Sequence, residues 1–298
     1  MTEITLLDGG MGQELVQRAG DRPTALWSTQ VMRDHPGLVA QVHADFFAAG
    51  ATLATANTYA ILRDRLIHAG IEDQFADLHD RALTEAETAR AAHGSGRIAG
   101  ALGPIGASYR PDLHPDPETA QAIYREIAAL HAPRVDLMIC ETVASLAHAS
   151  DILTATVPCG KPVWLACTVD DEDGRRLRSG EPVREAARRA ADLGAAAILA
   201  NCSAPEAMPA ALDAMASADL PTGAYANGFT QITKDFLKAN PTVDALSARR
   251  DMGPEPYADH ALGWLDHGAS ILGGCCEVGP AHIAEIAHRL KARGHTLT

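Results

Sequence analysis

The chain has 298 residues, of which 47% are hydrophobic and only 4% aromatic. This length suits one large α/β barrel or two smaller domains. The formal net charge is -13, and no run of basic residues stands out. The charge argues against nucleic acid or an anionic membrane surface as a partner.

The start of the chain and its cysteines indicate a compartment. Residues Met1 to Ile4 contain no basic segment and no long apolar run, so we expect no signal peptide. No apolar run is long enough to suggest a membrane span. Without a secretory signal, the six cysteines are interpreted as reduced thiols rather than a disulfide framework. We therefore expect a cytoplasmic protein.

The predicted elements alternate along the chain: apolar runs of strand length are followed by Ala-rich stretches with helical periodicity. Strands are predicted over residues 4–7, 51–56, 97–102, 135–140, 162–168, 195–200, 221–225 and 269–272. Helices are predicted over residues 35–49, 71–93, 182–193, 205–216, 257–267 and 281–293, from Asp116 and Pro117 onward, and in a short segment ending near residue 154. Residues 229–252 lack a single period and are interpreted as an ordered excursion.

Eight strands that alternate with helices are typical of a single (βα)8 barrel, the TIM barrel. A doubly wound open sheet is the competing α/β fold, but the count of eight and the length favour the barrel. No linker or shift in composition divides the chain. We therefore predict one barrel domain over residues 1–298.

Polar residues recur where the predicted strands end. They are Asp8, Asn57, Glu141, Asn201, Cys202, Asn227, Cys275 and Cys276. Barrel enzymes carry their chemistry at the carboxyl ends of the strands. A random scatter of polar residues would not choose the same end repeatedly, so we interpret this group as a candidate active site.

The three cysteines of this group predict a metal site. Neighbouring side chains on a strand point to opposite faces, so Cys275 and Cys276 can reach one metal only after the strand has ended. Gly273 and Gly274 are expected to supply the freedom to turn and to let the backbone approach a ligand. With Cys202, three thiolates would form a zinc site that keeps one position open. The alternative is buried core cysteine, since the chain has no Cys-x-x-Cys spacing.

The other candidates also have structural interpretations. Asp8 could cap the turn that follows it, and Asn57 and Asn201 could bind backbone groups at the barrel rim. Glu141 could pair with an arginine such as Arg110. Five histidines are expected on solvated helix surfaces rather than as ligands, namely His35, His43, His68, His131 and His148. The glycines after Asp8 lack the GxGxxG spacing of a dinucleotide-binding loop.

Two of the few aromatic residues flank the same predicted face. Trp27 and Tyr59 follow the first and second strands. Aromatic faces attract cations, and sulfonium or trimethylammonium groups are bound in aromatic cages. The two side chains are therefore candidates for binding an onium ligand, with packing on the barrel rim as the alternative.

Taken together, the motifs resemble those of the homocysteine S-methyltransferase family across nearly the whole chain. The motifs are Leu7-Asp8-Gly9-Gly10-Met11-Gly12, Asn57-Thr58-Tyr59, Glu141-Thr142, Asn201-Cys202-Ser203 and Gly273-Gly274-Cys275-Cys276. The last two, at this separation, are the most specific. The family includes users of S-methylmethionine, S-adenosylmethionine and betaine.

The resemblance implies a function and a role for each matched residue. It implies that Cys202, Cys275 and Cys276 bind zinc, and that Asp8 and Glu141 hold the amino group of homocysteine. Gly9, Asn57, Thr58 and Asn201 then belong to the substrate site, and Trp27 and Tyr59 to the donor site. The reaction would move a methyl group from an onium donor to the zinc-bound thiolate of homocysteine and give methionine.

Some features depart from the family or stay open. Residues 226–229 read Ala-Asn-Gly-Phe where many members have Pro-Asn-Ser-Gly, and the residues after Cys276 also differ. No cobalamin or folate module is recognised, so a methyl relay through cobalamin is not expected. The sequence does not choose among the donors, and it leaves open whether the chain forms a homo-oligomer.

Three alternative functions remain at this point. A zinc methyltransferase could act on another thiol or on a selenol. A non-catalytic protein could use the three thiols as a zinc or redox sensor. A metal-free barrel with other chemistry could carry Cys275 and Cys276 in its core.

Overall fold

The computed structural model describes residues 2–20, 24–230 and 248–298, and its centre is a parallel sheet. The strands are β1 (Glu3–Leu6), β2 (Leu53–Thr55), β3 (Arg97–Leu102), β4 (Leu137–Val143), β5 (Val163–Cys167), β6 (Ala197–Asn201), β7 (Thr222–Ala226), β8 (Ala269–Gly274) and β9 (Thr296–Leu297). Their order in the sheet is β2-β3-β4-β5-β6-β7-β8-β1-β9. A doubly wound sheet needs a point where the strand order reverses, and β2 to β8 have none.

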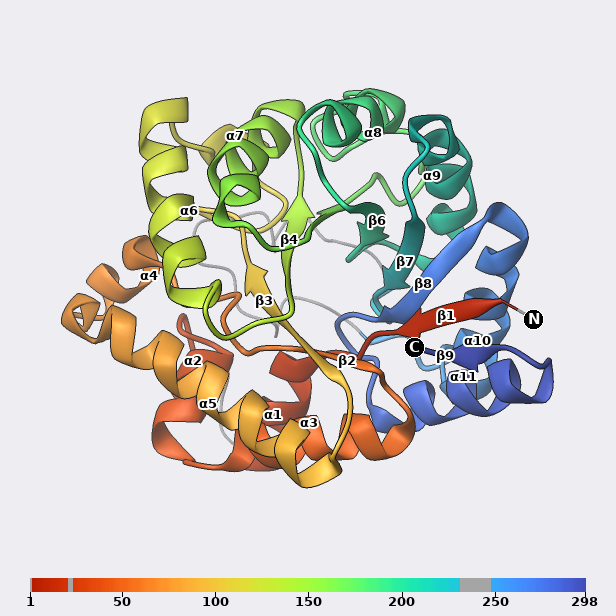
Figure 1. Cartoon of the computed structure of the whole chain (residues 1–298), viewed down its shortest axis with the longest axis horizontal. Coiled ribbons are helices and arrows are strands. Elements are labelled where there is room, and N and C mark those ends of the chain that lie inside the picture. Colours follow the sequence, from red (N-terminus) through yellow and green to blue (C-terminus); the bar gives the residue numbers. More distant parts are fainter. Residues whose placement is uncertain (1, 21–23, 231–247) are drawn as a thin grey trace.

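Helices cover the outer face of the curled sheet (Figure 1). They are α1 (Met11–Ala19), α2 (Ser28–Asp34), α3 (Leu38–Ala49), α4 (Arg63–His68), α5 (Phe75–His93), α6 (Pro117–His131), α7 (Leu146–Thr156), α8 (Val183–Asp192), α9 (Met208–Met215), α10 (Pro254–Gly263) and α11 (Pro280–Ala292). Short 3-10 turns are η1 (Glu72–Gln74), η2 (Pro111–Leu113), η3 (Val157–Cys159), η4 (Pro205–Ala207), η5 (Ala216–Ala218) and η7 (Trp264–His267). In α6, Asp116 accepts a hydrogen bond from the Thr119 amide at 3.1 Å, and Pro117 fills the first helical position, as the sequence predicts.

Buried apolar side chains form two layers. The larger cluster lies between the helices and the sheet and includes Phe46, Tyr124 and Trp264. A smaller cluster combines residues from strands around the curl, among them Leu53, Trp164 and Tyr225. Because strand residues alternate between these two layers, the strands are apolar on both faces, which explains their continuous apolar runs.

The first strand has neighbours on both sides. On one side Leu6 pairs with Leu272 of β8. On the other, β9 pairs with the start of β1, and β2 contacts its end through a bridge between Leu7 and Leu53. Two hydrogen bonds support the second contact, from the Thr52 amide to the Leu6 carbonyl at 2.7 Å and from the Asp8 amide to the Leu53 carbonyl at 3.1 Å.

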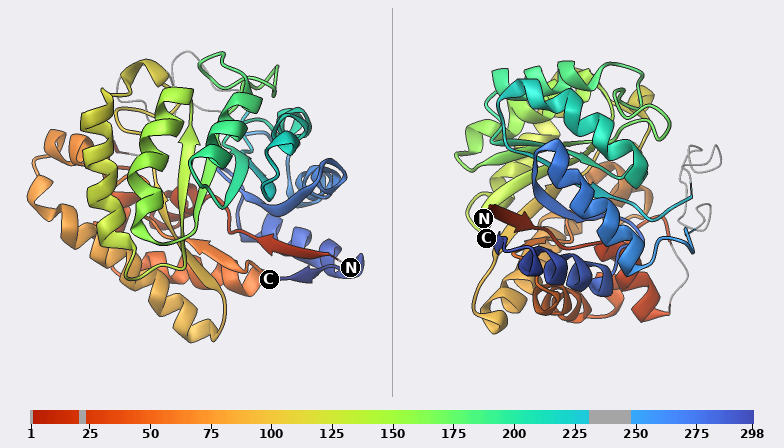
Figure 2. Two further views of the ribbon diagram at one scale, coloured as in Figure 1. Left: turned by 45° about the horizontal axis from the view of Figure 1, so that its top comes forward. Right: turned by 90° about the vertical axis from the view of Figure 1, so that its right-hand side faces the viewer.

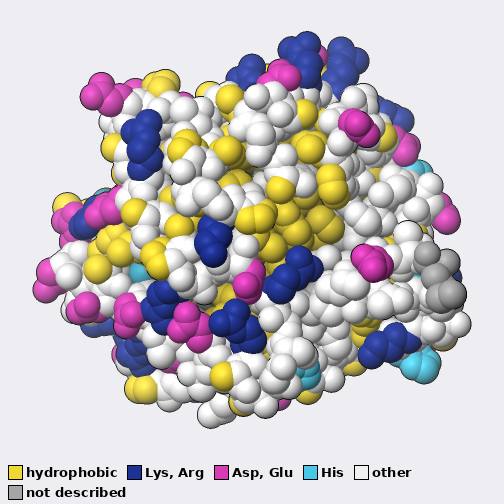
Figure 3. Space-filling model, viewed as in Figure 1, with side chains coloured by type: hydrophobic (Ala, Val, Ile, Leu, Met, Phe, Trp, Pro, Cys, Tyr) yellow, Lys and Arg dark blue, Asp and Glu magenta, His cyan; other side chains and the backbone are white. Residues whose placement is uncertain are grey.

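Both chain ends lie on one face, and β1 runs from that face toward the opposite one (Figure 2, right). Figure 3 shows hydrophobic side chains gathered at the centre of the face seen in Figure 1, with charged side chains around them. The polar residues singled out in the sequence follow the carboxyl ends of the strands, at the other end of the sheet.

Most predicted strands are found close to their expected positions, and the differences are local. β9, α1, α2 and α4 were not expected, and β8 continues two residues further, to Gly274. Most of the excursion expected over 229–252 falls on residues 231–247, outside the described residues. In the part of the chain that the structure describes, no helix has both the length and the apolar character needed to cross a bilayer.

Candidate active site

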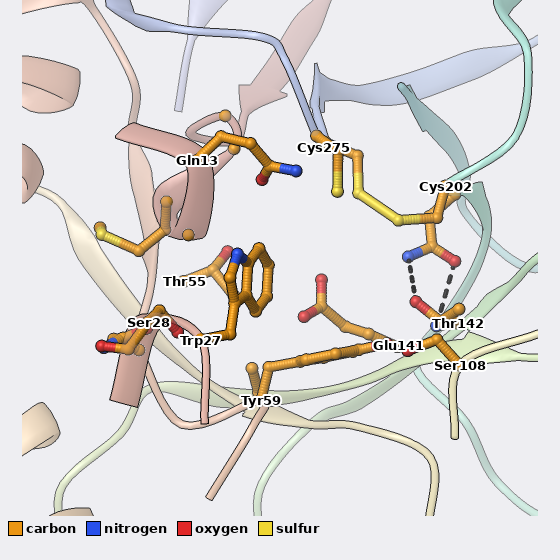
Figure 4. A pocket seen from close by; sticks show the side chains of 18 of the residues that line it. Gln13, Trp27, Ser28, Thr55, Tyr59, Ser108, Glu141, Thr142, Cys202 and Cys275 are labelled. Atoms are coloured by element: carbon orange, nitrogen blue, oxygen red, sulfur yellow. Dashed lines mark hydrogen bonds between the residues drawn. A yellow bond between two sulfur atoms is a disulfide. The ribbon is translucent and has the colours of Figure 1, made fainter. Parts of the chain in front are cut away.

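A pocket lies at the carboxyl ends of the strands and contains most of the residues expected there. Ten of the twelve candidate site residues line it: Asp8, Gly9, Trp27, Asn57, Tyr59, Glu141, Asn201, Cys202, Cys275 and Cys276. Thr58 and Asn227 do not. Figure 4 shows Gln13, Cys202 and Cys275 along one part of the pocket, here called the thiol side together with Cys276. Trp27 and Tyr59 form the aromatic side, and the Glu141 carboxylate projects between the two.

The three cysteine sulfurs come together as predicted, within 4.8 Å of one another. Tetrahedral zinc with Zn–S bonds of about 2.3 Å requires sulfur atoms about 3.8 Å apart, so small shifts would bring these thiols into its coordination sphere. Cys202 and Cys275 are joined as a disulfide, with their Cα atoms 5.8 Å apart. The expectation that all six cysteines are free thiols is therefore wrong for this pair. A metal would need the reduced form, because both sulfurs of the disulfide are its expected ligands.

Adjacent strands hold the backbone on the thiol side. The Cys202 amide donates to the Tyr225 carbonyl at 3.3 Å, and the Cys275 amide donates to the Ala226 carbonyl at 2.8 Å. Both cysteine segments are thus fixed to the end of β7, which lies between β6 and β8. The tertiary arrangement places thiols separated by 73 residues in one cluster.

The glycines before the paired cysteines have a different role from the one expected. Gly273 and Gly274 are the last residues of β8, and neither has a positive φ. A Cβ on Gly273 would lie 2.5 Å from the Leu7 side chain, and one on Gly274 would lie 2.1 Å from the Val278 side chain. These glycines therefore permit close packing, and the left-handed residue of the turn is Glu277, with φ of +64°.

The Asp8 carboxylate is buried at the end of β1. Its Oδ2 accepts a hydrogen bond from the Thr55 amide at 2.7 Å, and His43 Nδ1 lies 3.9 Å from the same oxygen. Burial raises the pKa of the Asp8 carboxyl to about 8, opposed by the hydrogen bond from Thr55 and assisted by the nearby Glu141 charge. An ammonium ligand would stabilise the ionised form of this buried carboxyl, because it supplies an opposite charge beside it.

Glu141 lies in the final part of β4 and faces the same pocket. Its Oε1 accepts a hydrogen bond from the Tyr225 hydroxyl at 2.9 Å. Burial raises the pKa of the Glu141 carboxyl to about 7, and the Tyr225 hydrogen bond partly offsets this. The alternative pairing with Arg110 is wrong, because the Arg110 guanidinium binds Asp112 instead.

The side chains of the candidate residues Asn57, Asn201 and Thr58 have different hydrogen-bond partners. Asn57 lines the pocket, and its Nδ2 donates to the Ser28 carbonyl at 3.4 Å. Asn201 also lines it, but its side chain binds Thr142, accepting from the amide at 3.1 Å. The Thr58 hydroxyl donates to the Ala101 carbonyl at 2.8 Å and accepts from the Ala101 amide at 3.1 Å. Thr58 therefore ties its loop to β3 instead of lining the substrate site.

The aromatic side is an edge-to-face pair. The Trp27 and Tyr59 ring centroids are 6.4 Å apart with their planes at 77°. The Tyr59 hydroxyl is 2.7 Å from the Ser108 hydroxyl, which fixes the ring. Gly12 makes room for Trp27, because a Cβ there would lie 2.1 Å from the indole.

Backbone strain concentrates around the pocket. Six described residues other than glycine have positive φ, and four of them line the pocket: Trp27, Tyr109, Thr142 and Cys202. For a β-branched residue such as Thr142 this conformation is unfavourable. Strained backbone of this kind persists where surrounding contacts fix it, and it clusters at functional sites.

Several residues of the pocket were not expected from the sequence. Gln13, Arg65, Ser108, Tyr109 and Tyr225 all line it. Gln13 lies one turn into α1 and Arg65 within α4, so neither follows a strand directly. No signal based on strand ends could have found these two side chains. Tyr225 is the last residue of the predicted strand 221–225 and was interpreted as an apolar strand residue.

The expectation of solvated histidines is wrong for three of the five. His43, His131 and His148 are buried in the described structure. His131 Nε2 is 2.9 Å from His79 Nδ1, and His148 Nε2 is 2.9 Å from the Tyr124 hydroxyl. Burial lowers the pKa of His43 to about 3 and that of His148 likewise to about 3, so both are neutral. They pack between helices and sheet because a neutral imidazole can be buried there.

Several known proteins are similar to this chain in sequence and in fold. The model of the homocysteine S-methyltransferase family matches residues 5–290. A homocysteine S-methyltransferase of Escherichia coli (strain K12) is 30% identical over 310 residues, which cover 96% of this chain and 95% of that protein. A selenocysteine Se-methyltransferase of Brassica oleracea var. italica is 23% identical over 320 residues, covering 97% and 89%.

Solved structures extend the likeness to three dimensions. Crystal structures of the homocysteine methyltransferase MmuM from Escherichia coli match with a TM-score of 0.81 and 28% identity in both a metallated and an oxidised form. The alignments cover 96% and 97% of this chain, respectively, and 96% of the MmuM chain in each case.

Proposed function

Because this chain belongs to the homocysteine S-methyltransferase family and is a methyltransferase of class EC 2.1.1, we propose that it methylates the sulfur of homocysteine to give methionine. The donor would be an onium compound such as S-methylmethionine, S-adenosylmethionine or betaine. The observation that carries the proposal is the pocket itself, where three cysteine sulfurs, two buried carboxyls and an aromatic pair meet.

The metal of this proposal is zinc, held by Cys202, Cys275 and Cys276 in the reduced protein. Three thiolates are a ligand set that zinc favours, and the sulfur spacing of this site fits it. Bound zinc would hold the substrate sulfur as a thiolate at neutral pH, where a free thiol with a pKa of about 8.5 is mostly protonated. The similar Escherichia coli protein has a metallated form, which supports a bound metal.

The two carboxylates would bind and orient homocysteine through its ammonium group. Asp8 and Glu141 face one pocket from different strands, so an ammonium between them could donate hydrogen bonds to both carboxyls and compensate one negative charge. Gly9 lines the same pocket, and a Cβ on it would lie 2.0 Å from the Val278 carbonyl oxygen, so this position has no room for a side chain. Fixing the amino group would aim the substrate sulfur toward the thiol side.

Trp27 and Tyr59 would hold the cationic end of the donor. Attraction to an aromatic face stabilises a sulfonium or quaternary ammonium group by about 0.5–2 kcal/mol. The donor loses this charge on transfer, so the aromatic pair would contribute to the reaction mainly by orienting the donor. A methyl carbon held in line with the acceptor sulfur avoids most of the entropy cost of bringing two free reactants together. Asn57 would contribute to the same wall.

The fold proposed for this activity is a closed (βα)8 barrel formed by one domain over residues 1–298. The bridge between Leu7 and Leu53, with its two flanking hydrogen bonds, supports closure between the first and second strands. A site that needs three reduced thiols would function in a reducing compartment such as the cytoplasm.

A separate observation supports a selenol as a second class of methyl acceptor. The Brassica oleracea relative is named a selenocysteine Se-methyltransferase. A selenol is more acidic than a thiol and would fit the same open metal position, so the alternative acceptor is a selenol-bearing amino acid.

The test uses purified protein, reduced and loaded with zinc. It is incubated with homocysteine and each donor in turn, and methionine is measured by mass spectrometry. Parallel reactions replace homocysteine with cysteine or selenocysteine. Methionine formation with at least one onium donor is expected. If zinc-loaded protein makes no methionine with any donor, the proposed reaction is wrong, and methylated selenocysteine alone would establish the second acceptor.

A further inference from the structure

The charged groups of the pocket are few and of two kinds. Among the described residues that line it, the carboxylic acids are Asp8 and Glu141, and the single permanently charged cation is Arg65. The two acids are accounted for by the ammonium of homocysteine under the proposed function. The guanidinium has no role in that account.

Arg65 has no acidic partner among the described residues. Its Nη2 donates a long hydrogen bond to the Pro104 carbonyl at 3.4 Å, and within the described residues no carboxylate lies within 4.0 Å of its side-chain nitrogens. The neighbouring Arg63 on α4 differs in this respect. Its guanidinium binds Glu126 at 2.6 Å and Glu72 at 3.3 Å, and it does not line the pocket. A partly buried arginine left without an anion is ready to bind one from a ligand.

The contacts of Arg65 place it on the aromatic side. Its Cζ lies 5.8 Å from the centroid of the Tyr59 ring, and that ring packs edge-to-face with Trp27. In Figure 4 the two aromatic side chains lie across the pocket from the cysteine sulfurs. An anion bound by Arg65 therefore belongs to the molecule whose onium group occupies the aromatic side.

We propose that Arg65 binds the carboxylate of the methyl donor and thereby selects donors that carry both an onium group and a carboxylate. This inference rests on the proposed function. The aromatic pair would recognise the cationic end, which sulfonium and ammonium donors share, and Arg65 would recognise the anionic end. The planar guanidinium can donate two parallel hydrogen bonds to a carboxylate, which adds direction as well as attraction.

The experiment compares donors that differ only in the carboxylate-bearing arm. One pair is S-methylmethionine and trimethylsulfonium, and the other is glycine betaine and tetramethylammonium. The pair used for kinetics is the one whose carboxylate member yields methionine with the wild-type enzyme. Kd is also measured by calorimetry, so that an onium that binds without reacting still gives a value.

Three variants are compared with wild type: Arg65→Met, Arg65→Lys and Arg63→Met. The last removes a charge from the same helix outside the pocket. In Arg65→Met we expect the preference for the carboxylate donor to fall at least tenfold, with binding of the carboxylate-free onium and the KM of homocysteine within about twofold of wild type. Arg65→Lys should retain part of the preference, and Arg63→Met should retain all of it.

The results distinguish a failure of this inference from a failure of the proposed function. An unchanged donor preference in folded Arg65→Met protein, or the same loss in Arg63→Met, overturns the inference. A rise in the KM of homocysteine with the donor preference unchanged also overturns it, because Arg65 would then bind the acceptor. Absence of methionine with wild-type enzyme and every donor would instead count against the proposed function.

Discussion

The thiol side and the aromatic side of the pocket are built in different ways. Cys202 follows β6 and Cys275 follows β8, and the amides of both cysteines donate to carbonyls of β7, the strand between them. Trp27 and Tyr59 lie instead in connections after β1 and β2, and they depend on each other and on Gly12 and Ser108 for position. The sheet itself fixes the thiols, whereas side-chain packing between loops fixes the aromatic pair. Changes to the two sides should therefore have different consequences.

The largest effect is expected from the thiol side. Cys275→Ser should lose most bound zinc and lower activity by more than about 100-fold, because a neutral hydroxyl replaces one of three thiolates. Zinc content is measured by elemental analysis after gel filtration of the reduced protein. Cys159→Ser serves as the control, because Cys159 lies outside the pocket. Full zinc occupancy in Cys275→Ser would remove this cysteine from the metal site.

The carboxylates between the two sides should act on homocysteine rather than on the metal. Glu141→Gln keeps the shape of the side chain and an acceptor for Tyr225 but removes the charge. We expect the KM of homocysteine to rise about tenfold or more, the effect of losing one charged hydrogen bond of about 1.5–3 kcal/mol. Zinc content and the KM of the donor should stay near wild type. Zinc loss in this variant would show that the role is assigned wrongly.

The raised carboxyl pKa values predict how binding depends on pH. Asp8 and Glu141 ionise near pH 8 and 7, so an amino-acid ammonium should bind more weakly as pH falls through this range. Methionine is the ligand to titrate by calorimetry, because it lacks a thiol that would ionise nearby. Its affinity should be lower at pH 6 than at pH 8, with a smaller difference in Glu141→Gln. Equal wild-type affinities at both values would contradict the assignment.

The same groups affect stability with a defined sign. A carboxyl whose pKa is about 4 in the unfolded chain and higher in the fold binds its proton more tightly when folded. Ionisation of the Asp8 carboxyl should therefore make the ligand-free protein less stable as pH rises from about 4 toward 8. Asp8→Asn should raise the Tm relative to wild type at pH 8 more than at pH 5. Equal shifts at the two pH values would show that Asp8 ionises normally.

Loss of an aromatic ring should have a moderate effect confined to the donor. Trp27→Leu removes an attraction of about 0.5–2 kcal/mol, which corresponds to a few-fold to about thirtyfold weaker donor binding. The KM of homocysteine should be spared. Donor and homocysteine titrations of the folded variant test this separately. Equal changes for both substrates, or a loss of stability alone, would show that Trp27 only packs against Gly12 and Tyr59.

The smallest effect on catalysis is expected from Thr58. Thr58→Val removes both hydrogen bonds to Ala101 and should lower the free energy of unfolding by about 1–3 kcal/mol. Neither substrate KM should change by more than about twofold. Urea unfolding and steady-state kinetics provide the two measurements. A selective rise in one KM would return Thr58 to the substrate site.

The alternation of strands and helices and the family could be predicted from the residues alone, because both depend on local patterns. Apolar runs followed by Asp8, Glu141 or Cys202 can be recognised without a structure, and the comparisons confirm the family. The strand-end pattern predicted seven of the pocket's lining residues, since parallel strands in one sheet must bring their carboxyl ends to one place. Gly9 was implied by the family resemblance, and Trp27 and Tyr59 were chosen as aromatic residues after the first two strands.

Which of these side chains face the pocket, and what each one contacts there, depends on how distant segments pack in the fold. Thr58 and Cys202 both follow strands, but the Thr58 hydroxyl turns toward β3 while Cys202 faces the pocket. Side-chain direction at a strand end depends on backbone angles that neighbouring strands impose, such as φ of +49° at Cys202. Arg65 enters the pocket because α4 packs beside the 103–106 loop, a contact between segments about 40 residues apart that no local pattern encodes.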